Sequence, residues 1–532
     1  MYKLFINGKI YTMENEMKMV TSLLVKKGLV HAYNDEAKSY KEFENVEVID
    51  LEGHVLMPSF IESHAHPLIY ANNALGLNLK NEETPSISAI LNAVKTRAKE
   101  RKPGEWILGA GWDDSKLAEK RFPTREELDE VAPNNPVFLK RTDAHNAVAN
   151  SLAFEMSNLS LNHKDPQGGH FDINEKTGKL SGLIQENAMD LFDIPSPTIA
   201  EQKEAMLVAQ EDFFKWGVTT VHEMAATKDI IKVFQSLQKD GRFKMKVRLW
   251  LWAIDQLGWK GVEKAVLDLG LESNLGSDYL NIQGLKYMLD GAVGGRTAAV
   301  RDPFEGEKDN TGILYMEQET INNHVSTAIE NDLRVSIHAI GERAMDMAVK
   351  SITQAASKEK NKQLRNRIEH CALATEEHMH QMKEHEIIAA SSIGFIYSIG
   401  DSYFENLGKE RTERIFPHAS FKRYGLVAPG NSDLPVCEGN PIYGIYAAVT
   451  RRTVGNKQLG TKECIPVYDA LKAYTIDAAY AGKDENILGT LEKGKYADMI
   501  ILSADPLEIE ENKLKDIYVK ETFIEGNSVY KK

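Results

Sequence analysis

The strongest constraint on the fold is a repeated alternation of strand-like and helix-like segments through the middle of the chain. Short apolar runs such as "WGVTTVHEM", "KVRLWLWAI" and "LRVSIHAIG" alternate with amphipathic stretches such as "RAMDMAVKSITQAASKEK". The pattern continues over about 250 residues and predicts an α/β fold with a parallel sheet, either doubly wound or closed as a barrel. The sequence contains no glycine-rich phosphate loop, which weakens the doubly wound nucleotide-binding alternative.

Both ends of the chain are instead rich in short strands. Asn7-Gly8 and Lys27-Gly28 each separate two strand-like runs and predict hairpins, and a third hairpin is predicted to turn at Gly526-Asn527. We therefore expect the two ends to combine into one small β-sandwich.

These patterns predict a division into domains. Residues 1–57 and 480–532 form the composite β-sandwich, and residues 58–479 form the catalytic barrel. An insertion of about 140 residues, at about 72–212, follows the first barrel strand and is rich in Trp, Pro and Gly, as in "GAGWDDSKLAEKRFPTREELDEVAPNNP". Such a segment is typical of a subdomain that covers the substrate.

Composition narrows the class of protein. With 42% hydrophobic and 27% charged residues among 532, the chain is typical of globular proteins, and no apolar run is long enough to span a membrane. The net charge of −14 argues against a nucleic-acid partner. Three cysteines and an N-terminus without signal-peptide features predict a reducing, cytoplasmic location.

Polar residues gather at the ends of the predicted strands. In "FIESHAHP", His64 and His66 would point to the same face of a strand, which is a metal-clamp geometry. Taken alone, the pair is equally compatible with surface or packing histidines. Other strand-like runs end with similar residues, namely Lys286, His338, His370 and Asp433. Imidazoles and a carboxylate at successive strand ends predict a site for zinc or a similar divalent ion.

These motifs also resemble a known family. "PSFIESHAHP" is similar to the His-x-His opening of the amidohydrolase superfamily. "GVTTVHE", "KYMLDGAVGGRTAA", "HAIGERA", "RIEHC", "SDLPV" and "GKYADMIIL" together resemble its YtcJ-like, or amidohydrolase 3, branch. The resemblance runs over nearly the whole chain and implies a TIM-like (β/α)8 barrel with a β-sandwich made from both ends.

The resemblance also implies roles for individual residues. His64 and His66 would bind a first metal, and Asp433 would contact that metal and the attacking water. His338 and His370 would hold a second metal. Asp433 and His338 are therefore the predicted catalytic residues, and the cofactor is one or two divalent ions, with zinc preferred.

Lys286 falls where many members of the superfamily carry a carboxylated lysine between two metals. A protonated amine about 4 Å from a divalent cation would be repelled by about 8 kcal/mol at an effective dielectric constant of 20. A plain lysine therefore cannot bridge two ions. Either Lys286 is a carbamate, which we favour, or it loses its proton, or only one metal is bound.

Four further residues are predicted to reach the substrate. His145 and His222 each have an equally good structural interpretation, as a helix cap and as a core histidine. Asp290 lies in a glycine-rich loop after a predicted strand, and Arg296 could bind a substrate carboxylate, although a structural ion pair explains it better.

The sequence therefore predicts a metal-dependent hydrolase that cleaves an amide-like, non-peptide C–N bond of a small substrate. The alternatives are a lactone or cyclic-imide hydrolase or an isomerase on the same scaffold, and a regulatory binding protein that has lost catalysis. A small-molecule substrate is the expected partner, with no nucleic acid, no membrane, and homodimer formation as the default oligomeric expectation.

Overall fold

A computed structural model describes most of the 532 residues, in two compact units. The described ranges are 2–15, 18–43, 45–80, 83–114, 116–141, 146–166, 169–175, 177–358 and 363–532. One unit comprises Met1–Leu68 with Leu207–Lys532, and the other comprises Ile69–Met206. Within the described residues, no helix has both the length and the apolar character needed to cross a membrane.

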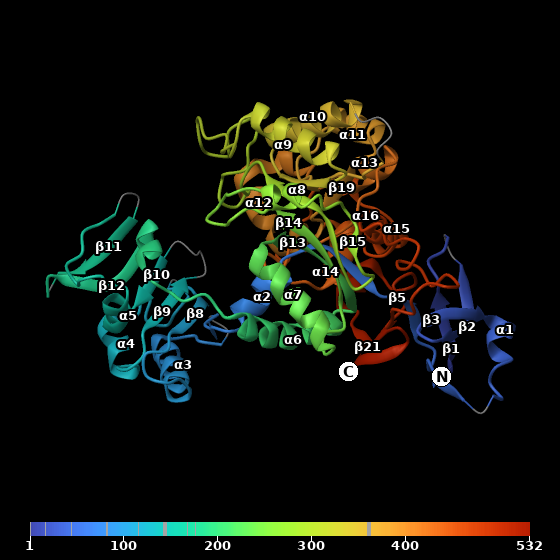
Figure 1. Ribbon diagram of the computed structural model, residues 1–532, viewed down its shortest axis with the longest axis horizontal. Helices are drawn as coiled ribbons and strands as arrows, with labels where there is room; N and C mark the ends of the chain where they lie inside the picture. Colours follow the sequence, from blue (N-terminus) through green and yellow to red (C-terminus); the bar gives the residue numbers. More distant parts are fainter. Residues whose placement is uncertain are drawn as a thin grey trace. The chain divides into compact units, whose positions relative to one another are not determined.

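The larger unit contains a nearly closed barrel of parallel strands (Figure 1). Its seven main strands, in spatial order, are β6 (Phe60–Ala65), β13 (Val218–Ala226), β14 (Lys246–Trp252), β16 (Leu280–Met288), β17 (Arg334–Ala339), β18 (Arg367–His370) and β19 (Ile388–Ser391). The short β15 (Leu275–Gly276) pairs with β16 outside this order. Nearly every residue of the seven is buried, as expected where helices cover a parallel sheet.

A segment at residues 427–434, the closing segment, joins the two edge strands. Its Gly430 forms a parallel bridge to Ser391 of β19, and its Leu434 forms one to Ala65 of β6. The expectation of a closed barrel rather than an open, doubly wound sheet is therefore confirmed at the level of an α/β, TIM-like barrel.

Amphipathic helices connect the strands. They include α7 (Lys228–Asp240), α9 (Gln318–Glu330), α10 (Glu342–Lys358), α11 (Glu376–Glu384) and α12 (Gly394–Thr412). In α7, the residues Ile230, Val233, Phe234 and Leu237 are buried at helical spacing, and Gly241 ends the helix with a φ of 75°. Helix α7 packs against β13 and β16, so its apolar stripe faces the sheet.

The two chain ends pair in a second sheet of the same unit. Its strands are β1 (Tyr2–Tyr11), β2 (Met19–Lys26), β3 (Leu29–Tyr33), β4 (Val46–Asp50), β5 (Val55–Pro58), β20 (Met499–Leu502), β21 (Val519–Ile524) and β22 (Asn527–Lys531). The first and last parts of the chain meet where β5 pairs antiparallel with β20. That the ends share a sheet agrees with expectation, whereas the sandwich arrangement and the domain boundaries stay predictions.

One of the predicted hairpins is wrong. Strand β1 runs straight through Asn7-Gly8, with a register shift against β2 between Ile6 and Ile10. Asn7 does adopt a φ of 58°, but Leu51 and the carbonyl of His54 pack so close to Gly8 that a Cβ there would meet atoms of both at 2.5 Å. The signal therefore marks an irregularity in a strand rather than a turn.

The other two hairpins form. Lys27 and Gly28, both with positive φ, connect β2 to β3. Glu525 and Gly526, also with positive φ, connect β21 to β22, so the turn lies one residue earlier than predicted.

The smaller unit has its own six-stranded sheet in the order β11-β12-β10-β9-β8-β7. The strands are β7 (Leu77–Asn78), β8 (Ile107–Trp112), β9 (Val137–Arg141), β10 (Asn146–Ala149), β11 (Gly169–Asn174) and β12 (Lys179–Glu186), accompanied by helices α3 (Ile87–Glu100), α4 (Arg125–Val131) and α5 (Ser151–Met156). Thr124 and Glu127 form a capping box at the start of α4.

Candidate metal centre

The predicted ligands come from the carboxyl ends of neighbouring barrel strands. His64 lies in β6 and His66 one residue beyond it, and Asp433 lies in the closing segment. The backbone N–H of Asp433 donates to the carbonyl of His64 at 3.1 Å, and that of His66 donates to the carbonyl of Leu434 at 2.7 Å. These two bonds hold the carboxylate beside both imidazoles.

Three of these residues form a compact donor group. Ligand atoms of His64, His370 and Asp433, all buried, lie within 4.8 Å of one another. Asp433 Oδ1 is 3.4 Å from His64 Nε2 and 3.1 Å from His66 Nε2. The His338 ring lies 4.4 Å from the His370 ring between centroids. The structure thus brings all four strand-end histidines and Asp433 to one rim.

Local backbone geometry aims two of these side chains. His370 has a φ of 68° and Asp433 a φ of 53°, which non-glycine residues adopt at a cost of about 1–2 kcal/mol. In a regular strand, His370 would point away from the face used by Glu369. Both residues nevertheless approach His64, so the positive φ redirects His370 toward the rim.

Several polar atoms at this rim are buried without a hydrogen-bond partner among the described residues. They include Asp433 Oδ1, His66 Nδ1 and Lys286 Nζ. Asp433 Oδ1 stays unpaired although the two imidazole nitrogens are near it. Buried polar groups are nearly always satisfied, so imidazole nitrogens that converge on a carboxylate oxygen without a hydrogen-bond partner fit a cation.

Burial keeps two of the imidazoles at the rim neutral. It lowers the pKa of His64 to about 4, with Lys286 adding to the effect, and holds the pKa of His370 well below its usual value. Both rings are therefore neutral at pH 7 and can act as ligands. For Asp433, burial opposes ionisation, but His64 and His66 outweigh it and keep the pKa of its carboxyl low.

Lys286 lies in β16 and is 3% exposed. Burial lowers the pKa of its amine to about 8, against the opposing charges of Glu369 and Asp433. An amine that is buried, loses its proton more readily than usual and has no hydrogen-bond partner among the described residues is the kind of group that can react with CO2 to give a carbamate. The role of Lys286 as a bridging ligand stays a prediction.

Two buried carboxylates in this region had not been singled out from the sequence. Glu369 accepts the Nδ1–H of His64 at 2.6 Å, and Glu223 Oε1 lies 3.7 Å from His66 Nδ1. The signal for Glu369 was available, because Arg367 and Glu369 are two residues apart in β18 and must share a face.

The remaining predicted residues have other contacts. His222 is fully buried, and its Nδ1 accepts hydrogen bonds from Arg367 at 3.0 Å and Trp250 at 3.3 Å. Arg296 pairs with Glu307 and donates to Asn406. Their substrate roles stay predictions.

Asp290 organises a loop beside the rim. Its carboxylate accepts backbone N–H groups of Ala299, Ile340 and Gly341 at 2.8–3.0 Å, and lies 3.3 Å from His338 Nε2. Asp290 is therefore placed to hold His338. His145 lies outside the described residues.

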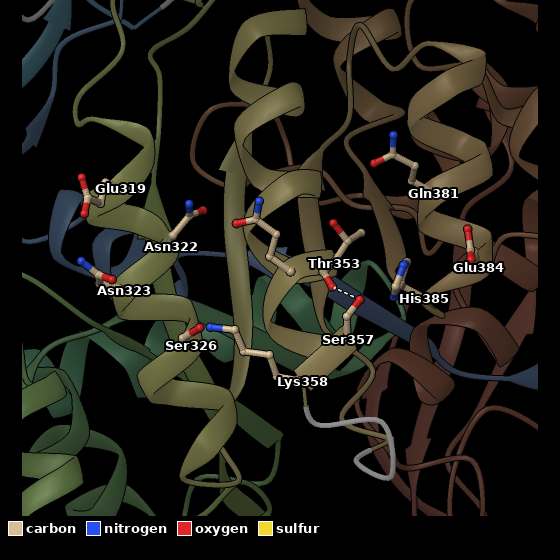
Figure 2. A pocket seen from close by; sticks show the side chains of 11 residues that line it. Glu319, Asn322, Asn323, Ser326, Thr353, Ser357, Lys358, Gln381, Glu384 and His385 are labelled. Atoms are coloured by element: carbon tan, nitrogen blue, oxygen red, sulfur yellow. Dashed lines mark hydrogen bonds between the residues drawn. The ribbon is translucent and has the colours of Figure 1, made fainter.

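A separate polar cavity of about 640 Å³ opens among α9, α10 and α11 (Figure 2). Glu319, Thr353 and Gln381 are among its lining residues. None of the predicted site residues that the structure describes lines it, so it is distinct from the strand-end group.

A nearly closed parallel barrel with imidazoles and a carboxylate gathered at its rim defines the class of metal-dependent hydrolases. The chain belongs to the amidohydrolase family, whose sequence model (Amidohydro_3, described as "Amidohydrolase family") matches residues 47–530. The predicted family is therefore confirmed.

Individual relatives extend over nearly the whole chain. It is 28% identical to the Bacillus subtilis (strain 168) protein named "Putative amidohydrolase YtcJ", over 99% of this chain and 98% of that protein. It is 30% identical to "Protein LONG AFTER FAR-RED 3" of Arabidopsis thaliana, over 99% and 91%. A solved structure of an uncharacterised metal-dependent hydrolase from Pyrococcus horikoshii OT3 matches with a TM-score of 0.79 and 27% identity, over 96% of this chain and 99% of that one.

Proposed function

We propose that this protein hydrolyses an amide-like, non-peptide C–N bond in a small molecule. The observation that carries the proposal is the convergence of His64, His370 and Asp433 ligand atoms within 4.8 Å at the carboxyl ends of the strands. Membership of the amidohydrolase family supports the same reaction class.

The donor set suggests which residues would hold the cofactor. His64 and His66 with Asp433 would bind one divalent ion, and His338 with His370 would bind a second. Lys286, as a carbamate, would lie between them. Zinc suits this combination of nitrogen and oxygen ligands best.

A divalent ion bound there would lower the pKa of a coordinated water to about 7 and would polarise a substrate carbonyl. Asp433 would orient the attacking water, accept its proton and transfer that proton to the leaving nitrogen. Its low carboxyl pKa keeps it ionised and ready to accept the proton.

His338 would take part as a ligand and as a neighbour of the substrate carbonyl. Its Nε2 lies 3.1 Å from the carbonyl of Gly291, which can only accept a hydrogen bond. In a neutral ring, Nε2 therefore carries the proton and Nδ1 keeps the lone pair, which favours the ligand role.

For substrate binding we propose supporting roles rather than direct contacts for two of the predicted residues. Asp290 would hold His338, and Arg296, paired with Glu307, would brace the loop that Asp290 begins. His145 and His222 stay candidates for contact with the substrate.

The remaining expectations are proposed on composition. All three cysteines are free, which supports a reducing cytoplasm. A small-molecule substrate is the proposed partner, without nucleic acid or membrane, and a homodimer stays the expected assembly.

The test is a metal analysis followed by an activity screen of the metal-loaded protein against N-acyl, N-formyl, cyclic-imide and lactone compounds. Hydrolysis of a C–N substrate that requires the metal is the expected result. Turnover of lactones alone would favour the alternative hydrolase. No bound divalent ion, and no activity after one is added, would favour a regulatory binding protein on the same scaffold.

A further inference from the structure

Below His64, the barrel contains a fully buried ion pair that the proposed reaction does not use. Arg367 and Glu369 lie two residues apart in β18, and both are 0% exposed. Arg367 Nε and Nη2 donate to the two carboxylate oxygens of Glu369 at 2.6 and 2.8 Å. This is the bidentate geometry that makes arginine–carboxylate pairs rigid.

The Glu369 carboxylate has two further donors. Ser336 Oγ donates to Oε1 at 2.7 Å, and His64 Nδ1 lies 2.6 Å from Oε2. A carboxylate that accepts hydrogen bonds from a bidentate guanidinium through both oxygens is itself an acceptor, so the proton between Glu369 and His64 belongs to His64 Nδ1.

Arg367 is itself fixed by three other groups. Nη2 donates to the carbonyl of Ser63, next to His64 in β6, at 2.8 Å. Nη1 donates to His222 Nδ1 at 3.0 Å, and the guanidinium lies 5.0 Å from the centre of the Trp250 ring. Arg367 thus fixes both the carboxylate that holds the His64 ring and the backbone that carries it.

His66 provides a contrast within the same site. Its Nδ1 is 3.7 Å from Glu223 and has no hydrogen-bond partner among the described residues. The two histidines of the His-x-His pair therefore differ at Nδ1, which has a hydrogen-bond partner among the described residues in His64 and none in His66.

We propose that Glu369 is a positioning residue for the metal centre. Anchored by Arg367, it keeps the proton of His64 on Nδ1 and directs the Nε2 lone pair toward Asp433, so that the ligand is preorganised before any ion arrives. The inference rests on the proposed metal centre, in which His64 is a ligand. Carboxylates that hydrogen-bond to a metal-ligating histidine typically change metal affinity by about 10- to 100-fold.

The test compares zinc affinities of purified proteins by competition with a chromophoric chelator. Glu369→Gln should bind zinc about 10- to 100-fold more weakly than wild type. In a His64→Ala background, Glu369→Gln should cause little further loss, because Glu369 acts through His64. An affinity of Glu369→Gln within twofold of wild type, or equal losses in both backgrounds, would overturn the proposal.

A matched control is available in the same barrel. Asp484 makes a similar buried bidentate pair with Arg248, at 2.6 and 3.0 Å, but within the described part of the chain neither residue hydrogen-bonds to a predicted ligand. Asp484→Asn should destabilise the protein yet keep the zinc affinity of wild type. If it weakened zinc binding as much as Glu369→Gln, a general structural effect would explain both, and the proposal would fail.

A measurement on wild type covers the case in which Glu369→Gln does not fold. Nitrogen-15 NMR of the histidine rings in metal-free protein should show His64 as the Nδ1–H tautomer. An Nε2–H tautomer would overturn the inference. This spectrum also separates the two ideas, because a wild-type protein that bound no divalent ion would refute the proposed function without deciding the tautomer.

Discussion

A buried ion pair connects the barrel to the sheet formed by the chain ends. Lys246 Nζ, at the start of β14, lies 2.6 Å from Asp498 Oδ2, and the two side chains are 0% and 2% exposed. The ammonium also lies 5.0 Å from the Tyr279 ring and 4.6 Å from the Tyr496 ring. The backbone carbonyl of Asp498 accepts the N–H of Ser59.

Two opposing terms decide what this pair contributes. At an effective dielectric constant of 20, charges 2.6 Å apart attract by about 6 kcal/mol. Removing both ions from water costs several kcal/mol each, so the intact pair adds little net stability. Removing only one partner leaves the other charge buried and unpaired, which costs about 3–5 kcal/mol.

We therefore expect Lys246→Met to lower the free energy of unfolding of this unit by about 3–5 kcal/mol. The double variant Lys246→Met/Asp498→Asn should be more stable than Lys246→Met alone, because no unpaired charge remains. Urea titrations followed by tryptophan fluorescence measure both. Lys244→Met is the control, since that amine bonds a carbonyl at the surface, and it should change stability by less than about 0.5 kcal/mol.

Two results would refute this reasoning. A loss below about 1 kcal/mol for Lys246→Met would mean that Asp498 is not stranded in a low dielectric. A double variant less stable than Lys246→Met would mean that the pair is not the source of the cost.

Three further predictions concern the site and the core. Asp433→Asn should keep most of the bound metal but lose about 10²- to 10⁴-fold in turnover, because an amide cannot accept the proton of the attacking water. Steady-state kinetics together with metal analysis would check this. Unchanged turnover would show that Asp433 takes no part in the chemistry. Crystals of the metal-loaded protein should show density for a carboxylate beyond Lys286 Nζ, and a bare amine between two fully occupied metals would disprove the carbamate. Burial lowers the pKa of His418 to about 3, whereas the unfolded chain takes up the proton near pH 6.5. Stability should therefore fall by about 1.4 kcal/mol per pH unit below 6.5, or about 2 kcal/mol by pH 5. His418→Phe should lack this pH-dependent loss of stability. Urea midpoints that fall equally for variant and wild type between pH 7 and pH 5 would contradict the prediction.

The barrel and its rim could be predicted from the sequence because both produce a repeated pattern of residues. Each buried strand is a short apolar run, and parallel strands present their carboxyl ends at one edge. Polar residues at those ends, from His64 to Asp433, therefore had to approach one another once the sheet closed. The resemblance of the motifs added the expected pairing of ligands, which spacing alone does not supply.

Local backbone geometry was not accessible in the same way. The Asn7-Gly8 pair carries a strong turn signal, yet tertiary contacts from Leu51 and His54 keep it inside β1. Likewise, strand alternation places Glu369 inward and His370 outward, and only a φ of 68° at His370 lets both approach His64. Such departures depend on contacts between residues that are distant in sequence, and local sequence patterns do not reveal these contacts.

The polar interior of the barrel links these observations. Arg248, Arg334 and Arg367 are all fully buried, although a barrel of this class is usually filled by branched apolar side chains. Buried guanidinium groups are tolerated only when paired, and each one here has partners: Asp484 for Arg248, Gln283 and backbone carbonyls for Arg334, and Glu369 for Arg367. The Trp250 ring lies 4.9 Å from Arg334 and 5.0 Å from Arg367. Because Arg367 then bonds Glu369 and the backbone beside His64, the rigid polar layer beneath the rim determines where the first proposed ligand points.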